Sequence, residues 1–128
     1  MGIDVGMNYI TYEGVVKSID KSLIPHIYIV TIEGPDVRTV FDIHKMLKVF
    51  DLNDNVKITI SKSMPSFKEG VDLVIKGFVI AKKYEEDTNK LLISLWGFLL
   101  VVESKLKHIF DSFNHMDEVY FKLEVLNK

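Results

Sequence analysis

The sequence contains no cysteine among its 128 residues. This absence excludes disulfide bonds, thiolate metal sites and thiol nucleophiles, and it favours a cytoplasmic protein over a small secreted one. Long hydrophobic runs are lacking too, because the longest, residues 91–102, is far shorter than the roughly 20 residues of a membrane-spanning helix. Residues 1–7 show neither the basic region nor the apolar stretch of a secretory signal peptide. We therefore expect a cytoplasmic protein without a membrane anchor.

Arginine is almost absent, because Arg38 is the only arginine among the 16 basic residues. The chain has 18 acidic residues. The bidentate guanidinium fork that recognises guanine or clamps phosphate is therefore nearly missing. Both signs of charge are scattered along the chain, so no basic patch marks a polyanion partner. Sequence-specific nucleic-acid recognition by the isolated chain is not expected.

Hydrophobic residues are plentiful, at 48% of the chain, and charged residues make up 27%. This balance lets the chain bury a core, and its length suits one domain of ordinary size. We predict one β-barrel domain over residues 1–128, with residues 1–8 flexible.

Alternation of apolar and polar residues, rich in valine and isoleucine, predicts strands along most of the chain. The expected strands are 9–19, 27–32, 37–43, 56–61, 71–84, 91–102 and 118–126. Helical spacing appears only at residues 44–50 and 105–113, the second of which also suits a packed loop. The predicted fold class is all-β: an antiparallel Greek-key barrel related to the oligonucleotide/oligosaccharide-binding fold, with one or two short helical segments.

Residues that could carry chemistry are not arranged for it. The four histidines do not lie three or four residues apart, and the acidic run at residues 85–87 suits a solvated turn. Ser94 and Ser104 are outside any Gly-x-Ser-x-Gly elbow, and no glycine-rich phosphate loop occurs. We expect no catalytic residue, no metal site and no cofactor.

Tyrosines on predicted strands offer one alternative function. Single-strand-binding barrels stack bases on exposed aromatic side chains in a basic groove. Four tyrosines could act in this way, although their neighbours are of mixed charge: Tyr9, Tyr12, Tyr28 and Tyr120. The alternative is therefore a free single-stranded nucleic-acid-binding protein.

The run 91–102 is unusual because, as one strand, it is apolar on both faces, whereas a barrel needs only its inner face to be dry. One face would carry Leu91, Ile93, Leu95, Leu99 and Val101, and the other Leu92, Trp96, Phe98, Leu100 and Val102. Two explanations remain open: residues 105–113 fold back over the outer face, or a partner chain covers it. Gly77 and Gly97 fall inside predicted strands and are expected to be structural glycines, at a bulge or a close backbone approach.

The order of motifs resembles that of the G subunit of archaeal DNA-directed RNA polymerase, the counterpart of the eighth subunit shared by eukaryotic nuclear RNA polymerases. The run Ser94-Leu95-Trp96-Gly97-Phe98-Leu99-Leu100 is similar to a Ser-Tyr-Gly-Gly-Leu-Leu-Met-like stretch of the eukaryotic members. Further similar segments, in the same order as in the family, are 16–20, Phe41-Asp42-Ile43, 47–49, Asp54 with 56–61, Gly77-Phe78-Val79 and Val119-Tyr120. The resemblance covers residues 12–126.

This resemblance implies a barrel without catalytic residues that binds the largest polymerase subunit. On this resemblance, we expect the chain to be a non-catalytic structural or assembly subunit of DNA-directed RNA polymerase, with no cofactor of its own. The apolar outer face of residues 91–102 is the expected interface, and its expected contact residues are Trp96, Phe98 and Leu100.

Overall fold

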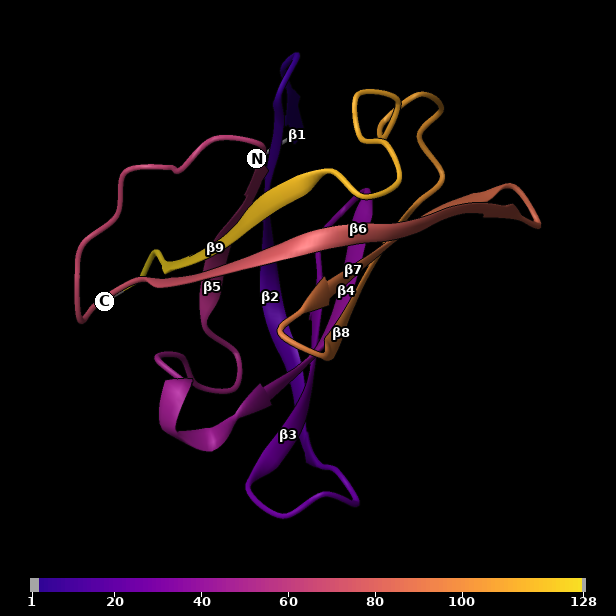
Figure 1. Ribbon diagram of the computed structural model, residues 1–128. Helices are drawn as coiled ribbons and strands as arrows, with labels where there is room; N and C mark the ends of the chain where they lie inside the picture. The colour runs from indigo at the N-terminus through magenta and orange to yellow at the C-terminus, as the bar shows by residue number, and fades with distance from the viewer. Residues whose placement is uncertain (1–2, 128) are drawn as a thin grey trace.

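The computed structural model describes residues 3–127, which form an almost purely β structure (Figure 1). The strands are β1 (Ile3–Val5), β2 (Tyr9–Lys21), β3 (Ile27–Glu33), β4 (Val37–His44), β5 (Asn55–Ser61), β6 (Leu73–Glu85), β7 (Thr88–Leu95), β8 (Phe98–Ser104) and β9 (Glu118–Val125). One 3₁₀ helix within the described range, η1 (Lys45–Leu47), follows β4. No helix of this range has the length and apolar character needed to cross a membrane.

Antiparallel pairing closes eight strands into a barrel, in the order β2-β3-β4-β8-β7-β6-β9-β5, with β5 returning to β2. Strand β1 lies outside this ring and pairs with the beginning of β2, on the edge that β3 occupies further along. Closure leaves few unpaired strand edges, which is how such folds avoid edge-to-edge association.

The chain path contains two Greek keys. Strands β2, β3 and β4 form a meander, and β5 then returns to lie beside β2. Strands β6, β7 and β8 repeat this path, and β9 returns to lie beside β6. A fourth strand that returns beside the first defines the Greek key. The predicted fold class is therefore confirmed.

Alternation along the strands sends one set of side chains into the barrel. In β5, Val56, Ile58 and Ile60 are fully buried, while Lys57 and Thr59 on the other face are only partly covered. Aromatic rings pack at the centre, where Phe41 lies edge-on to both Phe50 and Phe121, with centroids 6.2 and 5.1 Å away. Burying such side chains stabilises the fold by about 1.5–3 kcal/mol each.

Two of the three long connections add apolar side chains to the core. The one that contains η1 adds Phe50 to the core, and the one between β8 and β9 adds Ile109, Phe110 and Phe113. Residues 105–113 are thus a packed loop that sends Ile109, Phe110 and Phe113 into the core and leaves Leu106 exposed. Leu100 and Val102 belong to the same core cluster as these three side chains, whereas Leu99, on the opposite face of β8, stays 41% exposed.

Three further expectations concern the ends and turns of the strands. The helical turn predicted at residues 44–50 is present as η1. The single strand predicted over residues 91–102 is wrong, because β7 ends at Leu95 and β8 begins at Phe98. We expected residues 1–8 to be flexible; residues 3–5 form β1, and residues 1 and 2 lie outside the described range.

Candidate docking surfaces

Histidines and carboxylates do not assemble a metal site: between residues 3 and 127, no three of them gather as ligands would. The fold does bring His26 and His44 together, with ring centroids 6.0 Å apart, a neighbourhood that sequence spacing did not indicate. His108 Nδ1 lies 2.7 Å from Asp111 Oδ2 in an exposed turn. None of these pairs combines with a third potential ligand in the described chain.

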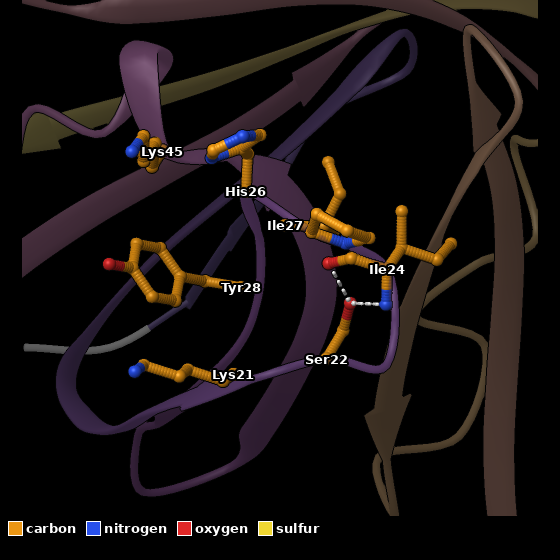
Figure 2. Close-up of a pocket in the computed structure, with 8 residues that line it drawn as sticks. Lys21, Ser22, Ile24, His26, Ile27, Tyr28 and Lys45 are labelled. Atoms are coloured by element: carbon orange, nitrogen blue, oxygen red, sulfur yellow. Dashed lines mark hydrogen bonds between the residues drawn. The ribbon is translucent and has the colours of Figure 1, made fainter.

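A small pocket of about 290 Å³ lies beside the His26–His44 pair, between the β2–β3 loop and η1. Figure 2 shows the Lys21 ammonium and the Tyr28 hydroxyl pointing to the same side of this pocket. The Ser22 hydroxyl is occupied within the loop, because it accepts from the Ile24 N–H at 2.9 Å and donates to the Ile24 carbonyl at 3.1 Å. The pocket thus brings two lysines, Lys21 and Lys45, together with the rings of Tyr28 and His26.

The four tyrosines considered for base stacking do not form one surface. Tyr12 is only 3% exposed and belongs to the core, so it is unavailable for stacking. Tyr9 donates a hydrogen bond to Asp4 at 3.1 Å, which raises the pKa of its hydroxyl. Tyr28 and Tyr120 line two different pockets. A continuous aromatic platform is therefore not built from these residues.

Trp96 and Gly97 form the two-residue turn that joins β7 to β8. Leu95 and Phe98 are paired across this turn, and both turn residues have positive φ angles, 55° for Trp96 and 91° for Gly97. Two successive positive φ angles define the type I′ turn, which matches the twist of the flanking strands. Asparagine and glycine favour this turn, whereas tryptophan does not, so the sequence pattern pointed to a continuous strand.

The turn reverses the face assignment of the second half of the predicted strand. Leu100 and Val102 join Leu91 and Ile93 in the core, each with 0% exposure, whereas Leu99 is 41% exposed on the outside. Leu100 is therefore a core residue, and its expected role as a partner contact is wrong. Phe98 follows the inward alternation and is half-buried at the end of its strand.

Trp96, by contrast, is 81% exposed at the tip of the β7–β8 hairpin. Its side chain appears in no hydrogen bond or ring contact within the described chain. Of the three contact residues expected from the sequence, Trp96 is thus the one that the fold leaves fully accessible.

A contiguous set of outward apolar side chains crosses four neighbouring strands, and we call it the outer apolar face. Cross-strand pairing places Val40 of β4 opposite Val101 of β8, and the separate ladder between β8 and β7 places Val101 opposite Leu92. The exposed members beside this row are Phe78 (43%), Ile80 (40%) and Leu99 (41%). The face therefore consists of Val40 on β4, Leu99 and Val101 on β8, Leu92 on β7, and Phe78 and Ile80 on β6.

Ion pairs border this face. Arg38 lies 3.5 Å from Glu103 and 3.8 Å from Glu33 on one side. On the other side Lys76 lies 3.1 Å from Glu118, and this contact raises the pKa of the Lys76 ammonium. A dry centre with a charged rim is the usual anatomy of a protein interface.

A second accessible apolar surface is a groove of about 640 Å³ between η1, the β5–β6 loop and β6. Its rim carries Met46, Met64 and Phe67, with exposures of 82%, 59% and 44%. Val74 and Lys76 line its floor, and Phe78 and Ile80 continue the same outward series along β6. The groove and the outer apolar face are thus neighbours on one strand.

Comparison with known proteins identifies relatives of the whole barrel. A family model described as the G subunit of DNA-directed RNA polymerase matches residues 9–125. DNA-directed RNA polymerase subunit Rpo8 of Sulfolobus acidocaldarius is 30% identical over 109 residues, which cover 83% of this chain and 89% of that protein. The protein of the same description from Saccharolobus solfataricus is 26% identical over 113 residues, covering 83% and 85% of the two chains.

One solved structure, the molybdate-bound form of the cytoplasmic molybdate-binding protein ModG, aligns over 91% of both chains with 9% identity and a TM-score of 0.39. A score at that level indicates nothing about function.

Proposed function

The chain belongs to the G-subunit family of DNA-directed RNA polymerase, and from that membership we propose that it is a non-catalytic, structural subunit that docks on the largest subunit of a cytoplasmic RNA polymerase. The proposed docking surface is the outer apolar face together with the tip of the β7–β8 hairpin.

The outer apolar face supports this location because a closed barrel needs no dry exterior for its own stability. Phe78 and Ile80 on β6 and Leu99 on β8 each leave about two-fifths of their surface in contact with water, on the two strands that flank β7. Clustered apolar side chains with a charged rim are typical of protein interaction sites, whereas single exposed ones are common everywhere.

Trp96 is the observation that carries the proposed location. A non-glycine residue in the left-handed region costs about 1 kcal/mol, and an exposed tryptophan gains little from burial in return. The isolated fold would therefore be better served by asparagine at this position. A tryptophan kept in a strained, exposed turn fits a contact with another chain, since large aromatic residues often contribute about 2 kcal/mol or more to an interface.

The test compares two adjacent leucines of β8 that differ only in the side of the barrel they face. Leu99→Asp places a charge on the outer apolar face, and Leu100→Asp places it in the core. Tagged Leu99→Asp protein should fold but recover at least about tenfold less polymerase largest subunit than wild type from a native lysate. Leu100→Asp should fail to fold, because an unpaired charge would be buried.

Leu23→Asp is the matched control, because Leu23 is fully exposed in the β2–β3 loop, away from the proposed surface. This variant should recover polymerase as well as wild type does. Failure of the wild-type protein to copurify with the largest subunit would refute the function. Recovery of polymerase by folded Leu99→Asp at wild-type levels would refute the location.

The same preparations address the alternative of a free nucleic-acid-binding protein. Phosphate contacts produce binding that weakens steeply with salt. We expect no such binding of a fluorescent single-stranded oligonucleotide by the isolated chain. Steep, salt-dependent binding together with absence of polymerase in the pull-down would favour the alternative.

A further inference from the structure

Asp42 is an acidic residue set among the apolar side chains of the outer barrel surface. It lies on the outward side of β4, two positions beyond Val40, and is half-buried. On β3 its cross-strand partner is Ile29. The ladder between β4 and β8 ends at the pair Phe41–Leu100. Asp42 is the next residue of β4 beyond this pair, and Leu99 is the next residue of β8. The carboxylate therefore borders the outer apolar face.

The fold supplies this carboxylate with no cation. Within residues 3–127 no hydrogen bond or ion pair reaches Asp42. Arg38, on the same face of β4, is engaged by Glu33 and Glu103. His44, two positions further along the same face of β4, accepts the Met46 N–H with its Nδ1 at 3.1 Å.

The residues that flank Asp42 on its own side of the sheet are the apolar Val40 and Ile29, together with His44, whose Nδ1 is already engaged. Beyond Ile29, the next residue across the sheet is Asp20 on β2, which is also acidic. Partial burial raises the pKa of the Asp42 carboxyl above its usual value, and no neighbouring charge offsets this effect. A carboxylate that loses water without gaining a donor disfavours the structure that buries it.

Docking on the outer apolar face would strip further water from Asp42, because Val40 of that face lies two positions away on the same side of β4 and Ile29 lies opposite it on β3. A partner with only apolar side chains would then bury an unpaired charge, which opposes association. A basic side chain at that point would instead form a charge-assisted hydrogen bond in a partly dry setting, where such bonds are strong and orient the two partners.

We propose that the segment of the largest polymerase subunit that covers the outer apolar face presents an arginine or lysine to Asp42, and that this ion pair fixes the register of docking. This inference rests on the proposed function and adds the chemistry of the partner: an apolar segment that carries one basic residue. Asp42 acts as a specificity determinant, because the apolar contacts on their own do not define one orientation.

The test uses two replacements of Asp42, and it separates the proposed ion pair from docking through apolar contacts alone. Asp42→Asn removes the charge and keeps the size, and Asp42→Leu makes the surface uniformly apolar. If the face docks through apolar contact alone, Asp42→Leu should bind polymerase as well as or better than wild type. Under the present proposal both variants leave the partner's cation buried without its anion, and recovery of the largest subunit should fall at least about tenfold.

Asp20→Asn is the matched control, since it removes the same charge from an exposed position of the same row. Its recovery of polymerase should equal that of wild type. The melting temperature of each isolated variant is measured in parallel, and Asp42→Asn should melt at or above the wild-type temperature, because the fold gives this charge no partner.

The outcomes separate this inference from the function on which it rests. Wild-type recovery by both Asp42 variants, with loss in Leu99→Asp, would overturn the ion pair and leave the docking surface in place. A marked drop in the melting temperature of Asp42→Asn would show that the carboxylate serves the fold and would also overturn the inference. Absence of the largest subunit from the wild-type pull-down would instead refute the function itself.

Discussion

The hydroxyl of Tyr12 on β2 lies 2.6 Å from the hydroxyl of Thr39 on β4, inside the barrel. Both side chains are buried, with exposures of 3% and 0%, and burial raises the pKa of the Tyr12 hydroxyl well above its usual value. Each hydroxyl is the other's side-chain partner. The pair therefore ties two strands that are separated by β3.

This pair predicts strong coupling between two replacements. Tyr12→Phe or Thr39→Val alone leaves one buried hydroxyl without its partner and should destabilise the fold by about 1–3 kcal/mol. The double variant removes both hydroxyls and should lose clearly less than the sum of the two. Urea denaturation of the four proteins gives the coupling energy. Simple additivity would show that the hydroxyls do not depend on each other.

Gly77 and Gly97 predict two different kinds of destabilisation. A Cβ atom at Gly77 would overlap the carbonyl oxygen of Ser94 on β7, so Gly77→Ala requires the backbone to move. At Gly97 there is open space, but φ is 91°, so Gly97→Ala meets only backbone strain of about 1 kcal/mol. Gly77→Ala should therefore unfold at the lower denaturant concentration.

Gly97→Asn serves as the control for this pair, because asparagine tolerates positive φ better than alanine does. It should be the mildest of the three changes. Equal midpoints for Gly77→Ala and the wild type would contradict the close approach of β6 and β7.

Trp96→Asn should separate stability from docking. Asparagine suits the first position of a type I′ turn, so the isolated chain should gain up to about 1 kcal/mol of stability. The same variant should recover less polymerase, because the exposed ring is lost. Thermal melting and the pull-down measure the two effects. A variant that melts lower than wild type would show that Trp96 contributes to the fold.

Asp117 predicts a contribution to stability that disappears in acid. The Asn114 N–H donates to its carboxylate at 2.7 Å, and the Lys62 ammonium lies 3.2 Å away; these contacts hold the pKa of Asp117 below its usual value of 3.8. A group with a lowered folded-state pKa stabilises the fold above its unfolded pKa and loses that effect as the pH falls through the folded value.

Asp117→Asn should therefore be less stable than wild type at about pH 6, and the difference should shrink as the pH falls below about 4. Chemical denaturation across this range measures it. A difference that is the same at every pH would assign the effect to the hydrogen bond from Asn114 and not to the charge.

Local patterns were sufficient for most of the strands. Alternation in β5 and β9 and the turn residues between β3 and β4 indicated elements that the structure contains. The same patterns indicated the helical turn that became η1. Such features depend on neighbours in the chain, and side-chain alternation reports the two faces of a strand directly.

Local patterns did not predict the β7–β8 hairpin. Trp96 is a poor turn former, and apolar residues flank it on both sides, so propensity favoured an uninterrupted strand. The turn forms because the paired strands β7 and β8 continue the sheet between β6 and β4. That non-local pairing moved Leu100 into the core and Leu99 to the surface.

The sequence by itself therefore determined the class of fold, the family and the interior of most strands, since each follows from motif order or from two-residue alternation. The tertiary structure decided three things: that β5 closes on β2, that Ile109, Phe110 and Phe113 enter the core, and that Asp42 lies beside Ile29 with no cation among residues 3–127. All three depend on which distant segments lie next to each other. Burial and charge pairing are properties of such neighbourhoods, so they become visible only when the strands are in place.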